Sequence, residues 1–344
     1  MGSATQSCGS GTIKLATAFD WFPTSGRAWL SVALALILVP CAPPAQAGTL
    51  VVGNKTENTV SFLDLDSGQE RARVETGPAP HEVAISPDGK QAAVVAYGGT
   101  TIDIFDVATA RRMKRIDLSP NEAPHGIAWL RTGRIVIAAE KSKSVVIVDP
   151  RRGLIRSIPT DQAGTHMLVV SPDRRRAYAS NIMAGTVSVI DLRERKKLSD
   201  ITVGGYPEGL ALTPDGRQLW VGDDSGGRIR VVDLATMETI DTLPADPVPV
   251  RIAISPDGKT AICSNIGSGT LNVFDVATRK PLRTISVSGA REAVQVTIAF
   301  SRDGKLVYVA ETGRDTIAEV DFATGEVLRR LTAGKGGDGL GIAP

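Results

Sequence analysis

The chain of 344 residues contains three histidines, and all three occupy one position of a recurring sequence pattern. His81 lies in PHEVAISPDG, His125 in PHGIAWLRTG and His166 in THMLVVSPDR. Each histidine precedes the third residue of a four-residue turn by seven positions. Imidazole changes its charge near neutral pH and serves as a general acid, a general base or a metal ligand. The shared position predicts that the three rings lie close together.

The other copies of the pattern carry, at this position, Glu208, Val250, Val296 and, near the end of the chain, Asp338. Imidazoles and carboxylates together form a suitable ligand set for Zn²⁺ or another divalent first-row metal. We therefore predict a metal or ligand site formed by His81, His125, His166, Glu208 and Asp338. Without a metal, adjacent imidazoles lower each other's pKa, which makes a neutral base available near pH 7. Arg251 is a candidate for holding an anionic group.

Two other interpretations of the histidines stay open. Repeats arise by duplication, so three neighbouring copies can share a histidine that only forms hydrogen bonds to the backbone of the next repeat. The histidines can also be solvated side chains of a loop. Further polar residues are expected in loops on the same face, among them Glu82, Tyr97, Glu140 and Arg251.

The elements that position these residues follow from an internal repeat. Seven alternating or apolar segments end in an aspartate, at Asp64, Asp106, Asp149, Asp191, Asp233, Asp275 and Asp321. The intervals between these aspartates are 42, 43, 42, 42, 42 and 46 residues. Seven repeats of this length account for the chain from Gly48 to Pro344, so residues 48–344 are expected to form a single domain.

Each repeat contains four short runs that are typical of strands. In the repeat of His81, an apolar run reaches the turn Ser86-Pro87-Asp88-Gly89, and KQAAVVAY, TTIDIFD and RRMKRIDL follow it. Proline at the second turn position and glycine at the fourth favour a type I turn. The first runs are apolar and the last is charged, so the last strand is expected on the outside. The pattern predicts an all-β fold, a seven-bladed β-propeller of four-stranded blades.

The ring is expected to close through both ends of the repeat region. GLGIAP near the C-terminus matches the first-strand run EGLALTP of residues 208–214, and the last repeat ends there. TLVVGN and TVSFLD, within residues 49–64, supply strands for the same blade. We predict that residues 337–344 pair beside residues 49–64, because this pairing removes the open edge of a linear stack.

The units VSVIDL, SPDG and VFDVATRK resemble the YVTN-type seven-bladed propeller repeat of exported bacterial proteins, and the resemblance covers essentially residues 48–344. Tyr178-Ala179-Ser180-Asn181 is similar to the tetrapeptide that names this repeat, whereas VVGN and ICSN depart further from it. The resemblance implies the propeller fold and leaves the activity open. The family with this repeat includes proteins encoded near quinone-dependent alcohol oxidation systems, and the family's fold is similar to that of bacterial lactonases.

Residues 1–47 are predicted to be a leader with a secretory signal peptide. Arg27 precedes an apolar run from Ala28 to Val39, and the small-residue site Ala45-Gln46-Ala47 follows it. The apolar run is shorter than the roughly 20 residues that a membrane-spanning helix needs, so no stable membrane span is expected. The sequence therefore predicts a periplasmic or secreted protein.

Charge and cysteine content argue against nucleic-acid binding and against a reactive thiol in the repeat region. Of the 39 basic and 37 acidic side chains, only Lys14, Arg27 and Asp20 precede residue 48, so the repeat region has nearly no net charge. This balance argues against a nucleic-acid partner. The run Arg174-Arg175-Arg176 occupies a predicted turn and is interpreted as a solvated hairpin tip. Cys263 is expected to be a buried, inert thiol.

Two functions remain. The first is a non-catalytic binding or accessory module with a small-molecule ligand or a periplasmic protein partner at the mouth of the central channel. The second is a lactonase-like hydrolase of small molecules that uses His81, His125, His166 and Glu208, with Arg251 holding an anionic group. The sequence does not specify the oligomeric state.

Overall fold

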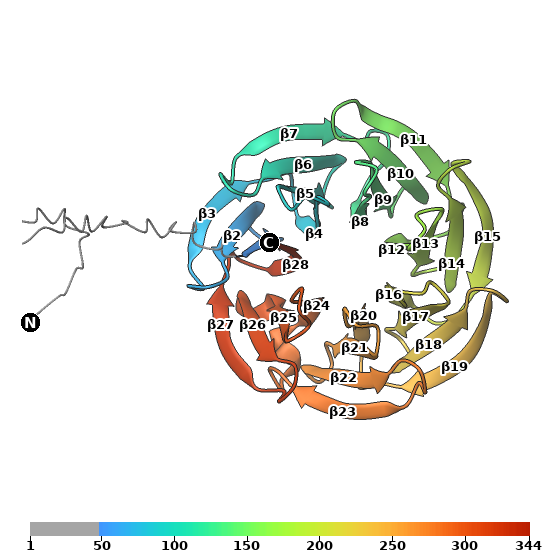
Figure 1. Ribbon diagram of the computed structural model, residues 1–344. Coiled ribbons are helices and arrows are strands. Elements are labelled where there is room, and N and C mark those ends of the chain that lie inside the picture. Colours follow the sequence, from blue (N-terminus) through green and yellow to red (C-terminus); the bar gives the residue numbers. More distant parts are fainter. Residues whose placement is uncertain (1–47) are drawn as a thin grey trace, which may run out of the picture. The chain divides into compact units, whose positions relative to one another are not determined.

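The structure is a computed structural model that describes residues 48–344. The predicted leader lies outside the described residues. Residues 48–344 form seven antiparallel sheets of four strands each, arranged as blades around a central axis (Figure 1). The predicted all-β seven-bladed propeller is confirmed.

The strand nearest the axis is the first of each blade, and the blades are numbered 1 to 7 in ring order. The inner strands are β28 (Gly337–Ala343), β4 (Pro80–Ile85), β8 (Pro124–Trp129), β12 (Thr165–Val170), β16 (Pro207–Leu212), β20 (Pro249–Ile254) and β24 (Gln295–Phe300). The second strands are β1 (Thr49–Asn54), β5 (Gln91–Ala96), β9 (Ile135–Ala139), β13 (Arg176–Asn181), β17 (Gln218–Asp223), β21 (Thr260–Asn265) and β25 (Leu306–Glu311).

The third strands end at the seven repeated aspartates. They are β2 (Thr59–Asp64), β6 (Thr101–Asp106), β10 (Ser144–Asp149), β14 (Thr186–Asp191), β18 (Arg228–Asp233), β22 (Thr270–Asp275) and β26 (Thr316–Asp321). The outer strands are β3 (Glu70–Glu75), β7 (Arg112–Asp117), β11 (Gly153–Pro159), β15 (Lys196–Thr202), β19 (Glu238–Pro244), β23 (Pro281–Ser286) and β27 (Val327–Thr332). Two short 3₁₀ helices, η1 (Arg291–Ala293) and η2 (Thr312–Arg314), complete the described elements. Neither is long and apolar enough to span a membrane.

Blade 1 combines the two ends of the repeat region, as predicted. Strand β28 pairs antiparallel with β1, so that Gly341 lies opposite Val51. On its other side, Val51 lies opposite Phe62 of β2. The pairing covers both edges of β1 and closes the ring.

Apolar side chains between neighbouring blades form the core. Seven buried clusters each join two adjacent blades. Phe62 of blade 1 and Phe105 of blade 2, for example, meet edge to face with ring centroids 5.8 Å apart. The outer strands are largely exposed, which agrees with their charged sequences.

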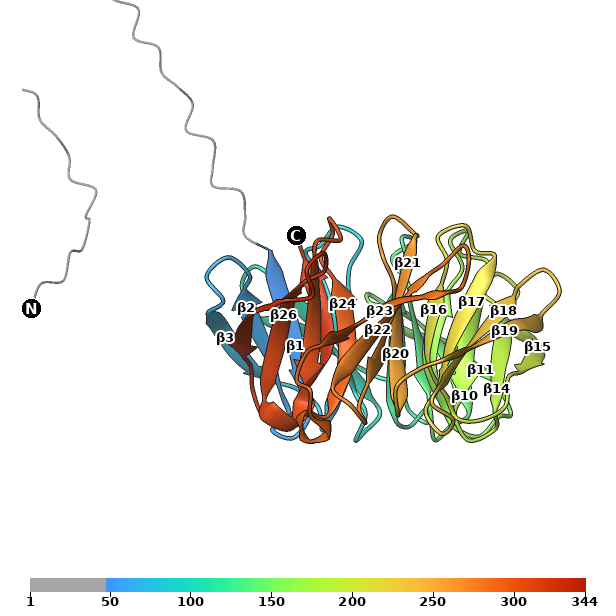
Figure 2. The ribbon, with the colours of Figure 1, turned by 90° about the horizontal axis from the view of Figure 1, so that it is seen from below.

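The two faces of the ring carry different loops (Figure 2). On one face, which we call the entry face, the chain enters each inner strand. On the opposite face, which we call the turn face, Ser86-Pro87-Asp88-Gly89 and its equivalents connect the first and second strands. Because all blades share this topology, one sequence position of the repeat lies at one height along the axis.

Candidate functional site

The predicted column of side chains lies at the start of the inner strands. Its members are the second residues of these strands: His81, His125, His166, Glu208, Val250, Val296 and Asp338. In every blade, the pairing of the inner with the second strand shifts register within the first residues of the inner strand. Such a bulge redirects side chains that a regular strand would turn away. Two successive residues of a blade can therefore face the axis.

The three histidines lie in a row, as their shared position predicts. The ring centroids of His81 and His125 are 4.8 Å apart, and those of His125 and His166 are 3.7 Å apart. Tyr97 meets His125 edge to face at a centroid distance of 5.4 Å. His81 and His125 are buried, whereas the side chain of His166 is 13% exposed.

His166 lies between two carboxylates. Its Nδ1 is 2.7 Å from Glu140 Oε2, and its Nε2 is 3.6 Å from Glu208 Oε1. Burial lowers the pKa of His166, but the two carboxylates raise it, and the net shift is upward. Tyr97 donates a hydrogen bond of 3.2 Å to Glu140 Oε1. His166 and Glu140 therefore form a charge-assisted pair that holds the imidazole in one orientation.

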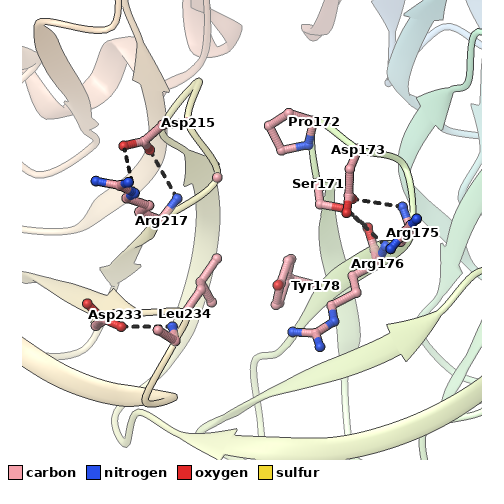
Figure 3. Close-up of a pocket in the computed structure, with 12 residues that line it drawn as sticks. Ser171, Pro172, Asp173, Arg175, Arg176, Tyr178, Asp215, Arg217, Asp233 and Leu234 are labelled. Carbon is pink, nitrogen blue, oxygen red and sulfur yellow. Dashed lines mark hydrogen bonds and ion pairs between the residues drawn. The ribbon is translucent and has the colours of Figure 1, made fainter.

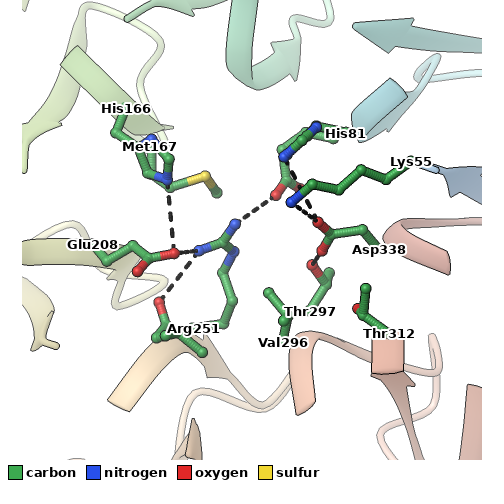
Figure 4. Close-up of polar contacts among 12 residues, drawn as sticks. Lys55, His81, His166, Met167, Glu208, Arg251, Val296, Thr297, Thr312 and Asp338 are labelled. Atoms are coloured by element: carbon green, nitrogen blue, oxygen red, sulfur yellow. Dashed lines mark hydrogen bonds and ion pairs between the residues drawn. The ribbon is translucent and has the colours of Figure 1, made fainter. Parts of the chain in front are cut away.

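Arg251 extends across the axis (Figure 4). Its Nη2 donates a 2.9 Å hydrogen bond to Glu82 Oε1, and its Nη1 donates to Glu208. Glu82 belongs to blade 2 and Arg251 to blade 6, on opposite sides of the ring. The sequence predicts loops for both residues, but they lie inside β4 and β20. The bulges explain this difference, because they let the third residues of these strands face the axis.

Asp338 lies near the axis beside His81, Lys55 and Thr297. Its Oδ2 is 3.6 Å from Lys55 Nζ and 3.8 Å from His81 Nε2, and its Oδ1 accepts a 3.3 Å hydrogen bond from Thr297. His81 Nδ1 is 3.1 Å from the carbonyl oxygen of Ala79. This contact places the proton of a neutral His81 on Nδ1 and leaves the lone pair on Nε2.

We call the connected residues the axial cluster. It consists of His81, Glu82, His125, His166, Glu208, Arg251 and Asp338. The structure brings together all six site residues predicted from the sequence. Val250 and Val296 occupy the same position in β20 and β24 and contribute apolar side chains.

Lys55 and Thr297 also contact the axial cluster, although neither is predicted from the sequence. Lys55 directly follows β1, just as Tyr97 follows β5 and Glu140 follows β9. A second column, made of the residues after the second strands, therefore lies next to the first. The repeat register could have identified Lys55, because the same register also aligns the residues that follow the second strands. Thr297 directly follows the predicted position, as Glu82 and Arg251 do.

Burial and ion pairing shift the pKa values of histidines and carboxylates in the cluster. Burial lowers the pKa of His81 to about 4, and burial beside the other two histidines lowers the pKa of His125 well below its usual value. Burial raises the pKa of Glu208, but Arg251 and His166 outweigh it and lower the value to about 2. At neutral pH the cluster therefore combines the neutral imidazoles of His81 and His125 with an ionised arginine and an ionised Glu208.

Two nitrogen atoms of the cluster lack a hydrogen-bond partner. Nδ1 of His125 and Nε of Arg251 are buried and unpaired within residues 48–344. Buried polar atoms are nearly always paired with protein, water or ligand. The cluster thus retains hydrogen-bonding capacity that the chain itself does not use.

No three His, Cys, Asp or Glu side chains in residues 48–344 are placed to hold a metal ion. The histidine rings lie side by side in a row, whereas a Zn²⁺ ion needs nitrogen atoms about 2.0 to 2.1 Å from one point. The predicted metal site stays a prediction, and nothing below depends on a metal. Cys263 is buried, and burial raises the pKa of its thiol, so it lacks the thiolate that a nucleophile requires.

Comparisons with known structures agree with the fold. Hydrazine synthase of Kuenenia stuttgartiensis aligns with a TM-score of 0.68 at 18% identity, over 75% of this chain and 87% of that chain. A functionally unknown protein of Desulfotomaculum acetoxidans gives 0.73 at 14% identity, over 86% and 98%. The dihydro-heme d1 dehydrogenase NirN, in complex with DHE, gives 0.65 at 17% identity, over 89% and 78%. At these identities the similarity concerns the fold alone.

The sequence comparisons are more specific. No curated protein sequence matches the chain. A family model described as "Lactonase, 7-bladed beta-propeller" matches residues 51–236, more than half of the chain. The narrower resemblance to the YVTN-type repeat stays a prediction. The chain belongs to the lactonase family of seven-bladed β-propellers.

Proposed function

We propose that the axial cluster binds a small, oxygen-rich ligand at the entry face, and that the protein is an exported binding or accessory module. The unpaired, buried Nδ1 of His125 and Nε of Arg251 carry this proposal. A ligand with hydroxyl or carboxyl oxygens would supply the partners that these atoms lack. The predicted leader supports export, and a periplasmic oxidation enzyme is a suitable kind of protein partner.

Some charged side chains in and around the cluster are partly exposed at the entry face. The side chains of Lys55, Glu140 and Glu208 are 41%, 19% and 13% exposed, respectively. Two large side chains, Met183 and Tyr206, are exposed on neighbouring loops of the same face. These loops contact each other, because the backbone nitrogen of Gly204 donates to the carbonyl oxygen of Gly185. A ligand with a short apolar part can pack against them while its oxygen atoms face the cluster.

The membership in the lactonase family suggests the ligand class. Lactones and the hydroxy acids formed from them are small and rich in oxygen acceptors. Arg251 is held by two carboxylates, Glu82 and Glu208, so its charge is already neutralised. Lys55, whose side chain is partly exposed, is therefore better suited than Arg251 to contact a ligand carboxylate.

Hydrolysis of a lactone is the second candidate, and the geometry of His81 favours it. With its proton on Nδ1, His81 can accept a proton from water through Nε2. The hydroxide would attack the carbonyl carbon, the ring C–O bond would break, and the leaving alkoxide would take a proton from an imidazolium such as that of His166. The product would be the open hydroxy acid. The low pKa of His81 makes it a weak base, which is why binding is our first proposal.

One experiment separates the two functions. Glucono-δ-lactone and gluconate are added to the full chain, binding is measured by calorimetry, and acid release is measured in a pH-stat. A binding module binds at least one probe without accelerating acid release above the spontaneous rate of the lactone, and His125→Ala removes binding. A hydrolase accelerates acid release above that rate, and His81→Gln lowers the acceleration by about 100-fold or more. Glu292→Gln, on the same face, is the control and should change neither. Failure of both probes to bind would contradict both functions.

A further inference from the structure

The inner strands end in apolar side chains on the turn face, opposite the axial cluster. Their sixth residues are Ile85, Trp129, Val170, Leu212, Ile254, Phe300 and Ile342, and all seven are only partly buried. The inner strands therefore have a mostly polar end at the entry face and an apolar end at the turn face. Partly exposed apolar side chains are the usual lining of a small-molecule site.

A pocket of about 430 Å³ lies at this apolar end, between blades 3, 4 and 5. We call it the Trp129 pocket. Its lining includes the apolar side chains of Trp129, Leu168, Val170 and Leu212, together with two arginines, Arg131 and Arg174. No Asp or Glu lines it, and neither arginine forms an ion pair within residues 48–344. The pocket thus combines an apolar floor with uncompensated positive charge.

Arg174 occupies a backbone position that favours glycine. Its φ is 60°, and the equivalent turn residues of five other blades are glycines with φ between 70° and 83°. Those residues are Gly89, Gly133, Gly216, Gly258 and Gly304. A side chain at positive φ costs about 1 kcal/mol or more, and such strain concentrates at functional sites. Arg131 stands where Pro87 and Pro172 stand in the neighbouring turns, so both arginines of the pocket depart from the turn pattern.

A second pocket of the same face has a different charge. It lies between blades 4 and 5 and contains Arg175 and Arg217, but also Asp173 and Asp215 (Figure 3). Arg217 Nε is 3.9 Å from Asp215 Oδ2, so its charge is partly compensated there. The Trp129 pocket is therefore the better candidate for an anion.

We propose that the Trp129 pocket binds a small organic anion, a carboxylate or phosphate group attached to an apolar body. The apolar body would be buried against Trp129 and the aliphatic side chains, and each buried CH₂ group contributes about 0.8 kcal/mol. The anionic group would accept hydrogen bonds from the guanidinium groups of Arg131 and Arg174, whose forked geometry matches carboxylate and phosphate. This site is separate from the axial cluster and does not depend on its function.

Trp129 provides the test, because the other tryptophan of the described residues, Trp220, is fully buried. Octanoate is titrated into the full chain while tryptophan fluorescence is recorded, and 1-octanol is the neutral comparison. We expect a saturable change with octanoate that disappears in Trp129→Phe. Binding of octanol, and of octanoate to the Arg131→Gln/Arg174→Gln variant, should be about tenfold weaker or more.

Arg302→Gln is the matched control, because Arg302 occupies the same turn position as Arg131 but in blade 7. It should leave octanoate binding unchanged. Circular dichroism of each variant shows whether the fold is retained. Equal binding of octanol and octanoate, or unchanged binding in the double arginine variant, would overturn the proposal. No saturable change with octanoate would also overturn it and would favour an acidic protein surface as the partner of these arginines.

Discussion

Arg251 determines the electrostatic balance of the axial cluster at the scale of single residues. Its buried guanidinium donates hydrogen bonds to both Glu82 and Glu208. Burying these charges is costly, and their mutual attraction offsets the cost only while all three are present. The cluster therefore behaves as one unit, and removing one member affects the others.

Replacing Arg251 with methionine should destabilise the protein by roughly 3–5 kcal/mol, because two carboxylates are then buried without their cation. Urea unfolding measures this change. The additional substitution Glu82→Gln should restore part of the loss. Arg279→Met is the control: Arg279 Nε lies 2.9 Å from Asp241 Oδ2 in a more exposed pair, so the loss should be below about 1 kcal/mol. Similar losses for Arg251→Met and Arg279→Met would contradict the bridging role.

Acid should destabilise the protein between about pH 6.5 and pH 4. The pKa of His81 is about 4 in the folded protein and about 6.5 in the unfolded chain. As the pH falls through this window, the unfolded chain takes up the proton first, and the free energy of unfolding falls by roughly 3 kcal/mol. His125 acts in the same direction. His166, with its raised pKa, contributes stability below pH 6.5 that is lost as the pH rises.

Urea unfolding at pH 7 and at pH 5 measures this dependence. His81→Gln, which cannot be protonated, should reduce the difference between the two pH values. An unchanged difference in this variant would show that His81 does not cause the acid sensitivity.

At the scale of elements, the bulge at the start of each inner strand decides which side chains reach the axis. The register of the repeat predicted that His81, His125 and His166 share one height, since turn chemistry and apolar runs fix each strand. It placed Glu82 and Arg251 in loops of the same face and did not predict that they lie inside strands, because a bulge is a backbone irregularity without a distinct residue signature here. Whether the Arg251 side chain can contact Glu82 on the opposite side depends on the diameter of the propeller ring, and the sequence of one repeat does not determine that diameter.

The turn that carries Arg174 allows a prediction of stability. Arg174→Gly should relieve the strain at φ 60° and raise the melting temperature by about 1–3 °C, since glycine adopts positive φ freely. Calorimetry measures the shift. Arg175→Gly, at the next position, has no such strain to relieve and should not raise the melting temperature. A lower melting temperature for Arg174→Gly would show that Arg174 stabilises the turn.

At the scale of the whole molecule, stability depends on the closure of the ring. The interval of 42 residues and the matching ends of the chain predicted both the number of blades and the pairing of β28 with β1. The longest interval, 46 residues, includes the segment around η1 that precedes β24. Side-chain detail between blades, such as the stacked rings of His125 and His166, could not be predicted because it depends on how neighbouring blades pack.

Deletion of residues 337–344 should destabilise the whole ring. It removes strand β28 and leaves one edge of β1 unpaired. Thermal unfolding followed by circular dichroism should show a large drop in the melting temperature, and a synthetic peptide of residues 337–344 should restore part of it where a scrambled peptide does not. A truncated protein that melts at the parent temperature would contradict closure by this strand.

The central claim is that the three histidines belong to one ligand-binding cluster, and nuclear magnetic resonance of ¹⁵N-histidine-labelled protein tests it most directly. The chain contains no other histidine, so every imidazole signal reports on this site. We predict that glucono-δ-lactone or gluconate shifts the signals of His125 and His166 in a saturable way, and that Glu292→Gln leaves this response unchanged. Imidazole signals that stay in place at saturating concentrations of both probes would contradict the claim.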